Sequence, residues 1–390
     1  MLLLQGLFNG LSIGSVLLIA ALGLAVVFGL MGVINLAHGE LMMLGAYSTF
    51  VVQNGFQVLG PPWSSIYILV ALPVAFVVTA LVGLALERGV IRFLYGRPLE
   101  TLLATWGVSL ILRQFVRSVN WPLAIGLATL CFLFFGGWVL LARLLPLERW
   151  RSLRSTALIS NGVLSLGIAI ALTATLWQTQ PAAWVRPWFG PRNVDVTAPA
   201  WLRGGIPVGT FQLPYARIFI IVLTLLCLAG MFLFLNGSNW GLRIRAVTQN
   251  RNMSACLGIN TGQVDALTFA LGSGLAGVAG VAVALLGSVG PNVGQNYIVD
   301  TFMVVVVGGV GNLLGSIIAA MAIGIFTYII GSGAIALLLS TANGPDVLIE
   351  LFNFFATTSM AKVIVFAAII TFLQVRPAGI FPPKGRTAEL

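Results

Sequence analysis

The chain has 390 residues, of which 59% are hydrophobic and only 8% are charged. This composition, with apolar runs long enough to cross a bilayer from end to end, is typical of an integral helical membrane protein and excludes a soluble enzyme. The net charge of +10 could indicate nucleic-acid binding, but the basic residues lie in short clusters between the apolar runs. We therefore predict an all-α polytopic membrane protein whose basic clusters lie in the cytoplasm.

A polar interruption divides the first apolar stretch. Asn35, His38 and Glu40 lie within it, and His38 is the only histidine of the chain. Ionisable groups inside a membrane segment face protein or a watery path, so these three are candidate path residues. They could instead cap broken helix ends or pair with each other. Gly39 marks a place where a helix can break at mid-membrane depth, and the resulting half-crossing predicts a cytoplasmic N-terminus.

The basic clusters also predict the order of the later crossings. They are Arg88, Arg92 and Arg97; Arg143, Arg149, Arg151 and Arg154; Arg243, Arg245 and Arg251; and Arg376, Lys384 and Arg386. If all four are cytoplasmic, consecutive clusters must be separated by an even number of crossings, and the apolar runs satisfy this parity. The result is a bundle of about ten transmembrane helices with broken or half-crossing segments, forming one domain over residues 1–390.

Two apolar runs within residues 121–178 precede a long loop, 178–215, which parity places on the external side. This loop is rich in tryptophan and proline, a composition that resists long helices and suits a cap near the membrane interface. We interpret it as an interfacial anchor, with a docking surface for another protein as the alternative.

Segment 240–262 is the most informative cytoplasmic stretch. Asn250 fits a helix N-cap and Gly258 a C-terminal cap, so we predict about two helical turns between them. Met253 and Leu257 then share one face at positions i and i+4. Such a helix suits docking into a groove on another subunit, although a connector lying on the surface is equally compatible. The candidate docking residues also include Arg245, Arg251 and Ala255.

A second glycine-rich break interrupts the late apolar region at Gly308, Gly309 and Gly311. Together with the break near Asn35 it suggests an internal duplication of the kind that transporters use, with the path at the repeat interface. The same glycines could instead serve only close helix packing.

Four segments together resemble the branched-chain amino-acid type permeases of ABC importers. They are residues 35–40, 255–261, 308–311 and 375–380. Within that family, residues 95–110, which include Trp106, and residues 381–386 look most like the first permease subunit of urea importers. The two extra apolar runs within 121–178 resemble a long form of that subunit. The resemblance covers most of the chain and implies a bacterial inner-membrane subunit that imports urea by alternating access; a branched-chain or other amino acid is the alternative substrate.

The resemblance also implies partners. These are a second, homologous permease subunit, two ATP-binding cassette subunits that hold ATP and Mg²⁺, a periplasmic substrate-binding protein and membrane lipid. This chain has no phosphate-binding loop of the usual kind, since its only lysines, Lys362 and Lys384, do not follow a glycine. We expect it to hold no cofactor or metal, to catalyse no reaction and to have a cytoplasmic C-terminus. Segment 240–262 would couple it to the ATPases, and Trp106 would join the path residues.

Asp300 carries the argument about substrate. The resemblance implies a lysine at the corresponding place in amino-acid permeases, which suits a carboxylate, whereas an acid or amide suits uncharged urea. Asp300 could instead mark the membrane boundary or cap the following helix. Two other classes of function remain: a passive urea channel, and a proton-coupled carrier that titrates Glu40, Asp265 or Asp300.

Overall fold

The predicted all-α architecture is confirmed. A computed structural model describes residues 2–144, 147–179, 181–208, 211–341 and 346–381, so the tail residues Lys384 and Arg386 lie outside the described residues. Within those ranges, 7 helices are long and apolar enough to cross a membrane, and two further apolar helices are shorter. The chain divides into two compact units, one of residues Met1–Leu110 and Asn193–Leu390 and the other of residues Ile111–Arg192.

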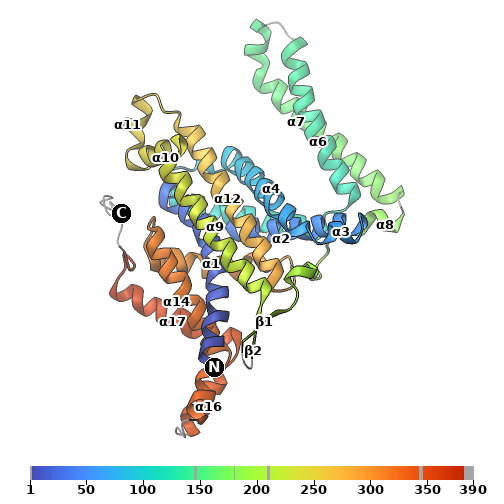
Figure 1. The fold of residues 1–390 in the computed structure, drawn as a ribbon. Helices are drawn as coiled ribbons and strands as arrows, with labels where there is room; N and C mark the ends of the chain where they lie inside the picture. Colours follow the sequence, from blue (N-terminus) through green and yellow to red (C-terminus); the bar gives the residue numbers. More distant parts are fainter. Residues whose placement is uncertain (1, 145–146, 180, 209–210, 342–345, 382–390) are drawn as a thin grey trace. The chain divides into compact units, whose positions relative to one another are not determined.

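The larger unit contains most of the secondary structure (Figure 1). Its longer helices are α1 (Leu2–Met31), α2 (His38–Val58), α4 (Tyr67–Gly89), α9 (Tyr215–Gly237), α10 (Asn239–Gln249), α12 (Thr261–Leu286), α13 (Val293–Gly308), α14 (Leu313–Gly331), α16 (Asp346–Phe355) and α17 (Thr358–Val375). The shorter ones are α3 (Pro61–Ser64), η1 (Ile91–Phe93), η2 (Ala200–Leu202), α11 (Arg251–Cys256) and α15 (Ala334–Thr341). Strands β1 (Gly205–Val208) and β2 (Phe211–Pro214) form an antiparallel hairpin.

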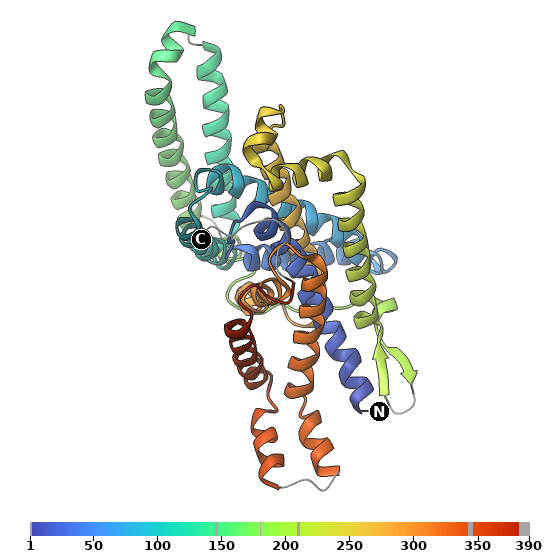
Figure 2. The ribbon, with the colours of Figure 1, turned by 90° about the vertical axis from the view of Figure 1, so that its left-hand side faces the viewer.

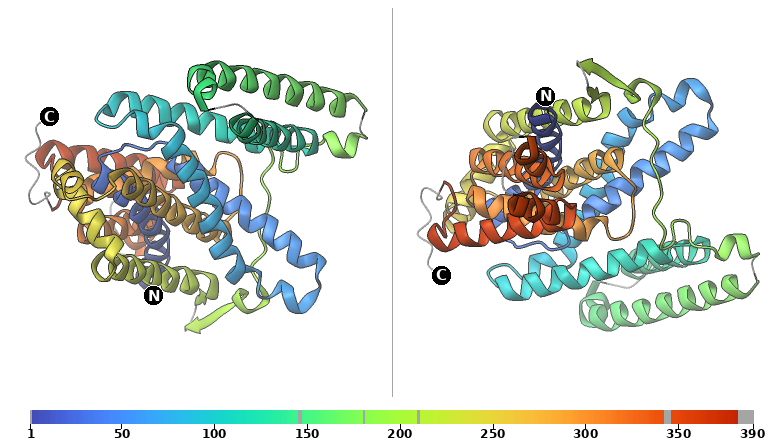
Figure 3. Two further views of the ribbon diagram at one scale, coloured as in Figure 1. Left: turned by 90° about the horizontal axis from the view of Figure 1, so that it is seen from above. Right: turned by 90° about the horizontal axis from the view of Figure 1, so that it is seen from below.

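The smaller unit is a helical hairpin. It contains α6 (Trp121–Leu144), α7 (Leu147–Thr179) and α8 (Ala182–Val185), and α5 (Pro98–Ser118) begins in the larger unit and ends in this one. Helices α6 and α7 lie side by side (Figure 3). Asn161 Nδ2 on α7 donates to the Phe134 carbonyl on α6 at 2.8 Å. The Trp121 ring packs edge-on against Trp188 at 4.9 Å. The residues of the predicted two-helix insertion therefore form a compact body of their own.

Helices α10, α11 and the C-terminal end of α4 form one end of the larger unit, which we call the basic end because it carries Arg88, Arg92, Arg243 and Arg245. The N-terminus and the β-hairpin lie at the opposite end (Figure 2). Close glycine contacts show that α1 runs antiparallel to α14, since a Cβ at Gly10 would meet Ile325 and one at Gly29 would meet Gly311.

The prediction that the N-terminus lies on the same side as the basic clusters is therefore wrong. The half-crossing helix exists, but α1 crosses fully before it. The non-helical segment 32–37 then carries the chain back from the basic end to the start of α2. This segment and α2 together complete one further crossing, which sequence parity could not count because the segment is not an apolar helix.

Two halves of the larger unit repeat the same order of elements. Helix α1 is followed by the non-helical segment 32–37 and α2, and helix α12 by the non-helical segment 287–292 and α13. The two copies are inverted, because α1 ends at the basic end whereas α12 begins there. The long helix of each copy packs on the last helix of the other, α1 on α14 and α12 on α4. The predicted internal duplication is thus present in the contacts, as in many transporters.

The non-helical segment that corresponds to the first break in the second copy is not the glycine-rich segment that the sequence predicted. Segment 287–292 corresponds to the first break, whereas the predicted break at Gly308, Gly309 and Gly311 is the turn between α13 and α14. In that turn Gly309 and Gly311 adopt φ values of 98° and 83°, which L side chains rarely adopt. Asn312 then caps α14 by accepting from the backbone N–H of Leu314 at 3.1 Å.

The two half-crossing helices meet at their N-termini. A Cβ on Gly39 would lie 2.3 Å from the Gly294 carbonyl oxygen, and one on Gly294 would lie 2.4 Å from the Gly39 carbonyl oxygen. Gly39 therefore lies one residue inside α2 and serves this crossing; it is not the break itself, which corrects the sequence prediction. Helix α2 continues across α12, where a Cβ on Gly45 would lie 2.2 Å from the Gly277 carbonyl oxygen.

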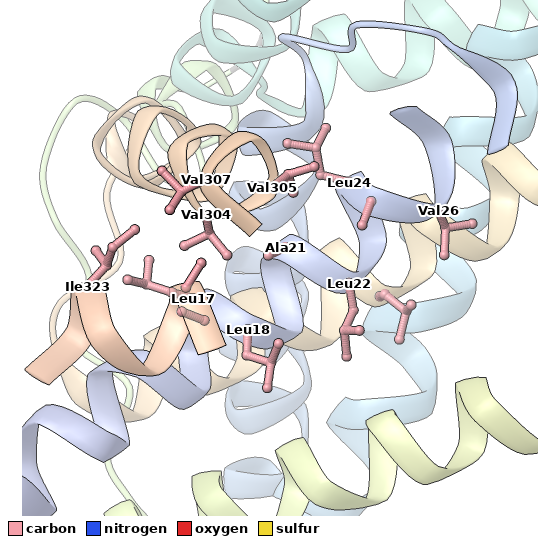
Figure 4. Close-up of a cluster of buried hydrophobic side chains, with 14 of the residues drawn as sticks. Leu17, Leu18, Ala21, Leu22, Leu24, Val26, Val304, Val305, Val307 and Ile323 are labelled. Atoms are coloured by element: carbon pink, nitrogen blue, oxygen red, sulfur yellow. The ribbon is translucent and has the colours of Figure 1, made fainter. Parts of the chain in front are cut away.

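Buried apolar side chains hold the two copies together. One cluster joins α1, α13 and α14 through residues such as Leu17, Val304 and Ile323 (Figure 4). A second joins α1, α2, α9 and α12 through residues such as Ile19, Met42 and Ala279. Between membrane helices such contacts stabilise by van der Waals packing, which requires the small residues that let the backbones approach.

We predict that Gly39→Ala destabilises the protein whereas Gly55→Ala on the same helix does not. The new methyl group at position 39 would meet a backbone carbonyl that cannot move aside, and overpacking of this kind costs about 1–3 kcal/mol. At position 55 nothing lies within 4 Å, and alanine gains helix propensity of about 1 kcal/mol. Thermal unfolding of the purified protein, followed by tryptophan fluorescence, should give a lower midpoint for the first variant only. Equal unfolding midpoints for the two variants would refute the close contact between the N-termini of α2 and α13.

Candidate functional site

The non-helical segment 32–37 lies against helix α5. The Leu36 N–H donates to Thr105 Oγ1 at 3.2 Å, and the Thr105 hydroxyl lies 3.4 Å from the Ile34 carbonyl oxygen. Non-helical backbone at membrane depth must find its hydrogen bonds within the protein. The Thr105 hydroxyl bonds to two backbone groups of this segment, so α5 helps to stabilise the first break.

The three polar residues predicted at this break are all buried. Asn35, His38 and Glu40 expose 2%, 0% and 1% of their surface. The Ala37 N–H donates to Asn35 Oδ1 at 3.0 Å, and His38 Nε2 lies 3.0 Å from the Ala20 carbonyl oxygen. Because a carbonyl only accepts, Nε2 carries the imidazole hydrogen of the neutral ring and Nδ1 is left as an acceptor. The structure therefore gathers the three side chains between α1, α2 and α5.

A row of hydroxyl groups on α5 belongs to the same cluster, and the sequence analysis missed it. Thr101, Thr105 and Ser109 recur at every fourth position and are 3%, 1% and 5% exposed. The Ser109 hydroxyl donates to Glu40 Oε1 at 3.1 Å. The regular spacing was the available signal, since it places all three on one face of a helix. Trp106, which was predicted in the path, lies off this row and is 51% exposed.

Two polar atoms of the cluster have no hydrogen-bond partner among the described residues. They are Asn35 Nδ2, a donor, and His38 Nδ1, an acceptor. Both lie within a few residues of the point where the N-termini of α2 and α13 cross. Buried polar atoms in native proteins are almost always hydrogen-bonded, to protein or to water. The break thus offers one donor and one acceptor to a small polar molecule, beside two helix N-termini whose dipoles favour negative charge.

Asp300 makes an ion pair that the sequence did not predict. Its Oδ2 atom lies 2.5 Å from Lys362 Nζ on α17, and its side chain is 8% exposed. The ammonium group also donates to the Asn296 carbonyl oxygen at 3.3 Å and lies 6.0 Å from the centre of the Tyr297 ring. Asp300 lies two turns inside α13, and Asn312 caps the following helix α14, so the alternative of a helix cap is wrong. Its described hydrogen bond goes to α17 and not to the groups at the first break.

Segment 240–262 contains two helices, α10 and α11, and the predicted caps are confirmed. Asn250 Oδ1 accepts from the Met253 N–H at 3.0 Å, and Gly258 has a φ of 84°. Met253 and Leu257 are 60% and 75% exposed, and Ala255 is exposed beside them. Arg245 on α10 donates to Asn236 Oδ1 at 3.3 Å. The predicted apolar face of α11 is therefore open.

Arg251 points away from that face. Its Nη2 atom lies 2.6 Å from Asp265 Oδ2 near the start of α12, and its guanidinium lies 5.0 Å from the centre of the Tyr95 ring. The Tyr95 hydroxyl in turn donates to Glu87 Oε1 on α4 at 3.1 Å. Burial raises the pKa of Tyr95, so its hydroxyl keeps the proton that it donates. Arg251 therefore makes its described contacts within this chain, and its side chain is 46% exposed.

A cavity of about 270 Å³ adjoins this group at the basic end. It lies between the end of α4 and the start of α12, and it is lined by Glu87, Arg88, Arg92, Asn260, Gly262 and Gln263. Among the described residues no cluster of three or more histidine, cysteine or acidic side chains could hold a metal ion.

Comparison with known proteins identifies the family. The profile described as "Branched-chain amino acid transport system / permease component" matches residues 6–373. The permease protein BraD of the high-affinity branched-chain amino acid transport system of Pseudomonas aeruginosa is 26% identical over 97% of this chain and 95% of its own length. The corresponding LivH protein of Escherichia coli is 25% identical over 97% of this chain and 94% of its own. No solved structure matches.

These matches span almost the whole chain, including both inverted copies and the segments between them. They agree with a structure in which 7 described helices are long and apolar enough to cross a membrane. The chain is a multi-pass membrane protein and a transport subunit, not an enzyme, and it belongs to the permease component family of branched-chain amino acid transport systems.

Proposed function

We propose that this chain is the membrane-spanning subunit of an ATP-driven importer, and that its substrate is a branched-chain amino acid. The observation that carries the proposal is the match over nearly the full length to permeases named for that transport. The open, capped helix α11 supports it, because a subunit that cannot bind nucleotide needs a surface through which an ATPase can act.

The partners follow from the same proposal. Two ATPase subunits, which hold ATP and Mg²⁺, dock on α10 and α11. A second, homologous permease subunit lies beside this one, and a periplasmic binding protein delivers substrate to the opposite end. The basic end is then cytoplasmic by the positive-inside rule, and so is the C-terminus, which follows α17. The protein lies in the bacterial inner membrane.

Transport proceeds by alternating access around the first break. Asn35, His38 and Glu40 line the path there, together with Thr105 and Ser109 from α5. Their polar atoms lie where the half-crossing helices α2 and α13 meet, which is the usual place of a transport site in inverted-repeat folds. Movement of one copy against the other would open the cluster first to one side and then to the other.

The Asp300–Lys362 pair favours an amino acid over urea. The sequence argument for urea depended on a carboxylate at a place where amino-acid permeases carry a lysine. In this chain Lys362 brings an ammonium group to within 2.5 Å of that carboxylate. The pair thus presents a carboxylate and an ammonium group, which are the two charges that would complement the ammonium and the carboxylate of an amino acid. The negative charge of Asp300 is therefore no longer an argument for a neutral substrate. Because Asp265 and Asp300 are both ion-paired, the pairs also count against a proton carrier that titrates either one.

Urea is the second candidate, and the residues at the first break favour it. The buried side chains there are an amide, an imidazole, a carboxylate and two hydroxyl groups, with no lysine or arginine among the described neighbours. Urea offers two N–H₂ donors and a carbonyl acceptor, which the donors and acceptors of these side chains can match. The similarity of residues 95–110 to urea permeases supports the same reading.

The substrate is decided by competition. We expect uptake of labelled leucine by membranes that contain the complete importer to be reduced by excess isoleucine or valine and not by excess urea, because the binding protein and the path discriminate by charge and shape. A matched assay uses labelled urea in the same membranes. Urea uptake that leucine fails to inhibit would reverse the choice between the two candidates.

We predict that Glu40→Gln leaves the importer assembled and reduces uptake by about tenfold or more, since a mismatched buried polar group costs about 1–3 kcal/mol. Glu100→Gln is the control, because Glu100 is an exposed residue of the first turn of α5 whose ion pair among the described residues is with the exposed Arg97. Co-purification of the partner subunits measures assembly, and labelled-substrate uptake measures transport. Wild-type uptake by an assembled Glu40→Gln importer would remove Glu40 from the path.

We predict that Leu257→Asp keeps the chain folded and inserted but releases the ATPase subunits. A carboxylate on this open apolar face must lose its water against the partner, at a cost of about 3 kcal/mol or more. Ile206→Asp is the control, because Ile206 is an exposed apolar residue of β1 at the opposite end. Co-purification with the ATPase should fail for the first variant alone. Retention of the ATPase by Leu257→Asp would show that α11 is not the docking helix.

A further inference from the structure

Four side chains tie the base of α11 to the rest of the basic end. Arg251 of α11 bonds to Asp265 of α12 at 2.6 Å and stacks over the Tyr95 ring at 5.0 Å. Tyr95 donates to Glu87 of α4 at 3.1 Å. These residues come from α11, α12, α4 and the loop that follows η1, so a single chain of contacts joins the exposed helix to two crossing helices.

Burial makes the Arg251–Asp265 interaction stronger than an ordinary surface ion pair. The side chain of Asp265 is 4% exposed and that of Arg251 is 46% exposed, so the carboxylate is held inside the protein while the guanidinium reaches in from the edge. Glu87 is 1% exposed. Charges shielded from water interact more strongly than exposed ones, and removing one partner leaves the other buried without compensation.

Helix α12 carries any displacement of Asp265 to the first break. Farther along the same helix, Gly272 contacts the backbone of Gly23 on α1, and Gly277 contacts that of Gly45 on α2. A Cβ at Gly23 would also lie 2.9 Å from His38 Cε1. Backbones in such close contact cannot slide freely past one another, so a pull on the start of α12 must shift the elements that surround His38.

We infer that the Arg251–Asp265 pair, held in place by Tyr95 and Glu87, is the element that transmits movement of α11 to α12 and so to the polar cluster at the first break. This inference rests on the proposed function, because it assumes that an ATPase moves α11. Arg251 and Asp265 are positioning residues: they touch neither substrate nor nucleotide. Met253 and Leu257 hold the ATPase, and Arg251 passes its movement on.

The test separates docking from transmission. The complete importer, reconstituted in lipid nanodiscs, is assayed for retained ATPase, for basal ATP hydrolysis and for the stimulation of hydrolysis by substrate-loaded binding protein. Asp265→Asn keeps the size of the side chain and removes its charge. We expect it to retain the ATPase and the basal hydrolysis but to lose stimulation by at least about fivefold, the lower range of coupling between distant sites.

Combined variants and a control sharpen the result. Arg251→Gln should reduce stimulation as well, and Arg251→Gln with Asp265→Asn should be no worse than Asp265→Asn alone, because both changes break one pair. Tyr95→Phe removes only the hydroxyl bonded to Glu87 and should cause a smaller loss. Arg97→Gln is the control, since Arg97 is an exposed arginine outside α10 and α11 that pairs with the exposed Glu100.

Normal stimulation in Asp265→Asn would overturn the inference. So would release of the ATPase by this variant to the extent expected for Leu257→Asp, because the pair would then only shape the docking surface. If Asp265→Asn does not accumulate in the membrane, the Tyr95→Phe and Arg251→Gln variants decide by the same readouts. Failure of the proposed function itself looks different: the wild-type importer and the Arg97→Gln control would show no stimulation either.

Discussion

The structure depends on one constraint, which is that polar groups at membrane depth must be satisfied by protein. Segment 32–37 leaves the helical conformation inside the bundle, and its backbone can do so because Thr105 and the neighbouring side chains supply hydrogen bonds. The break in turn lets α2 begin at the middle of the unit, where its first turn crosses that of α13. The glycines of this crossing permit a backbone contact that any side chain would prevent.

An inverted repeat turns this local break into a transport geometry. Each copy contributes one full crossing helix, one non-helical segment and one half-crossing helix. The two copies pack on each other because α1 contacts α14 and α12 contacts α4. Two helix N-termini and a set of buried polar side chains therefore meet at the interface between copies. Packing at such an interface has few stable arrangements, which is what an alternating-access mechanism requires.

Much of this could be predicted from the sequence, and the failures have physical causes. The polar break, the caps Asn250 and Gly258 and the multi-pass fold follow from local composition and spacing. The orientation of α1 does not, because the short non-helical segment 32–37 carries no apolar helical signature. The ion pairs Asp300–Lys362 and Arg251–Asp265 join residues far apart in the chain, and their partners are set by the tertiary fold. Trp106 and Ser109 share a helix, and only its rotation decides which one is buried.

The most direct test of the account is ATP-dependent uptake in vesicles that contain only the purified importer. We predict that leucine accumulates against its gradient when ATP is supplied on the side of α11 and loaded binding protein on the opposite side, and that omission of either stops uptake. Uptake that proceeds without ATP and only down the gradient would contradict the account, because the chain would then be a passive channel and its inverted repeat would serve no driven alternation.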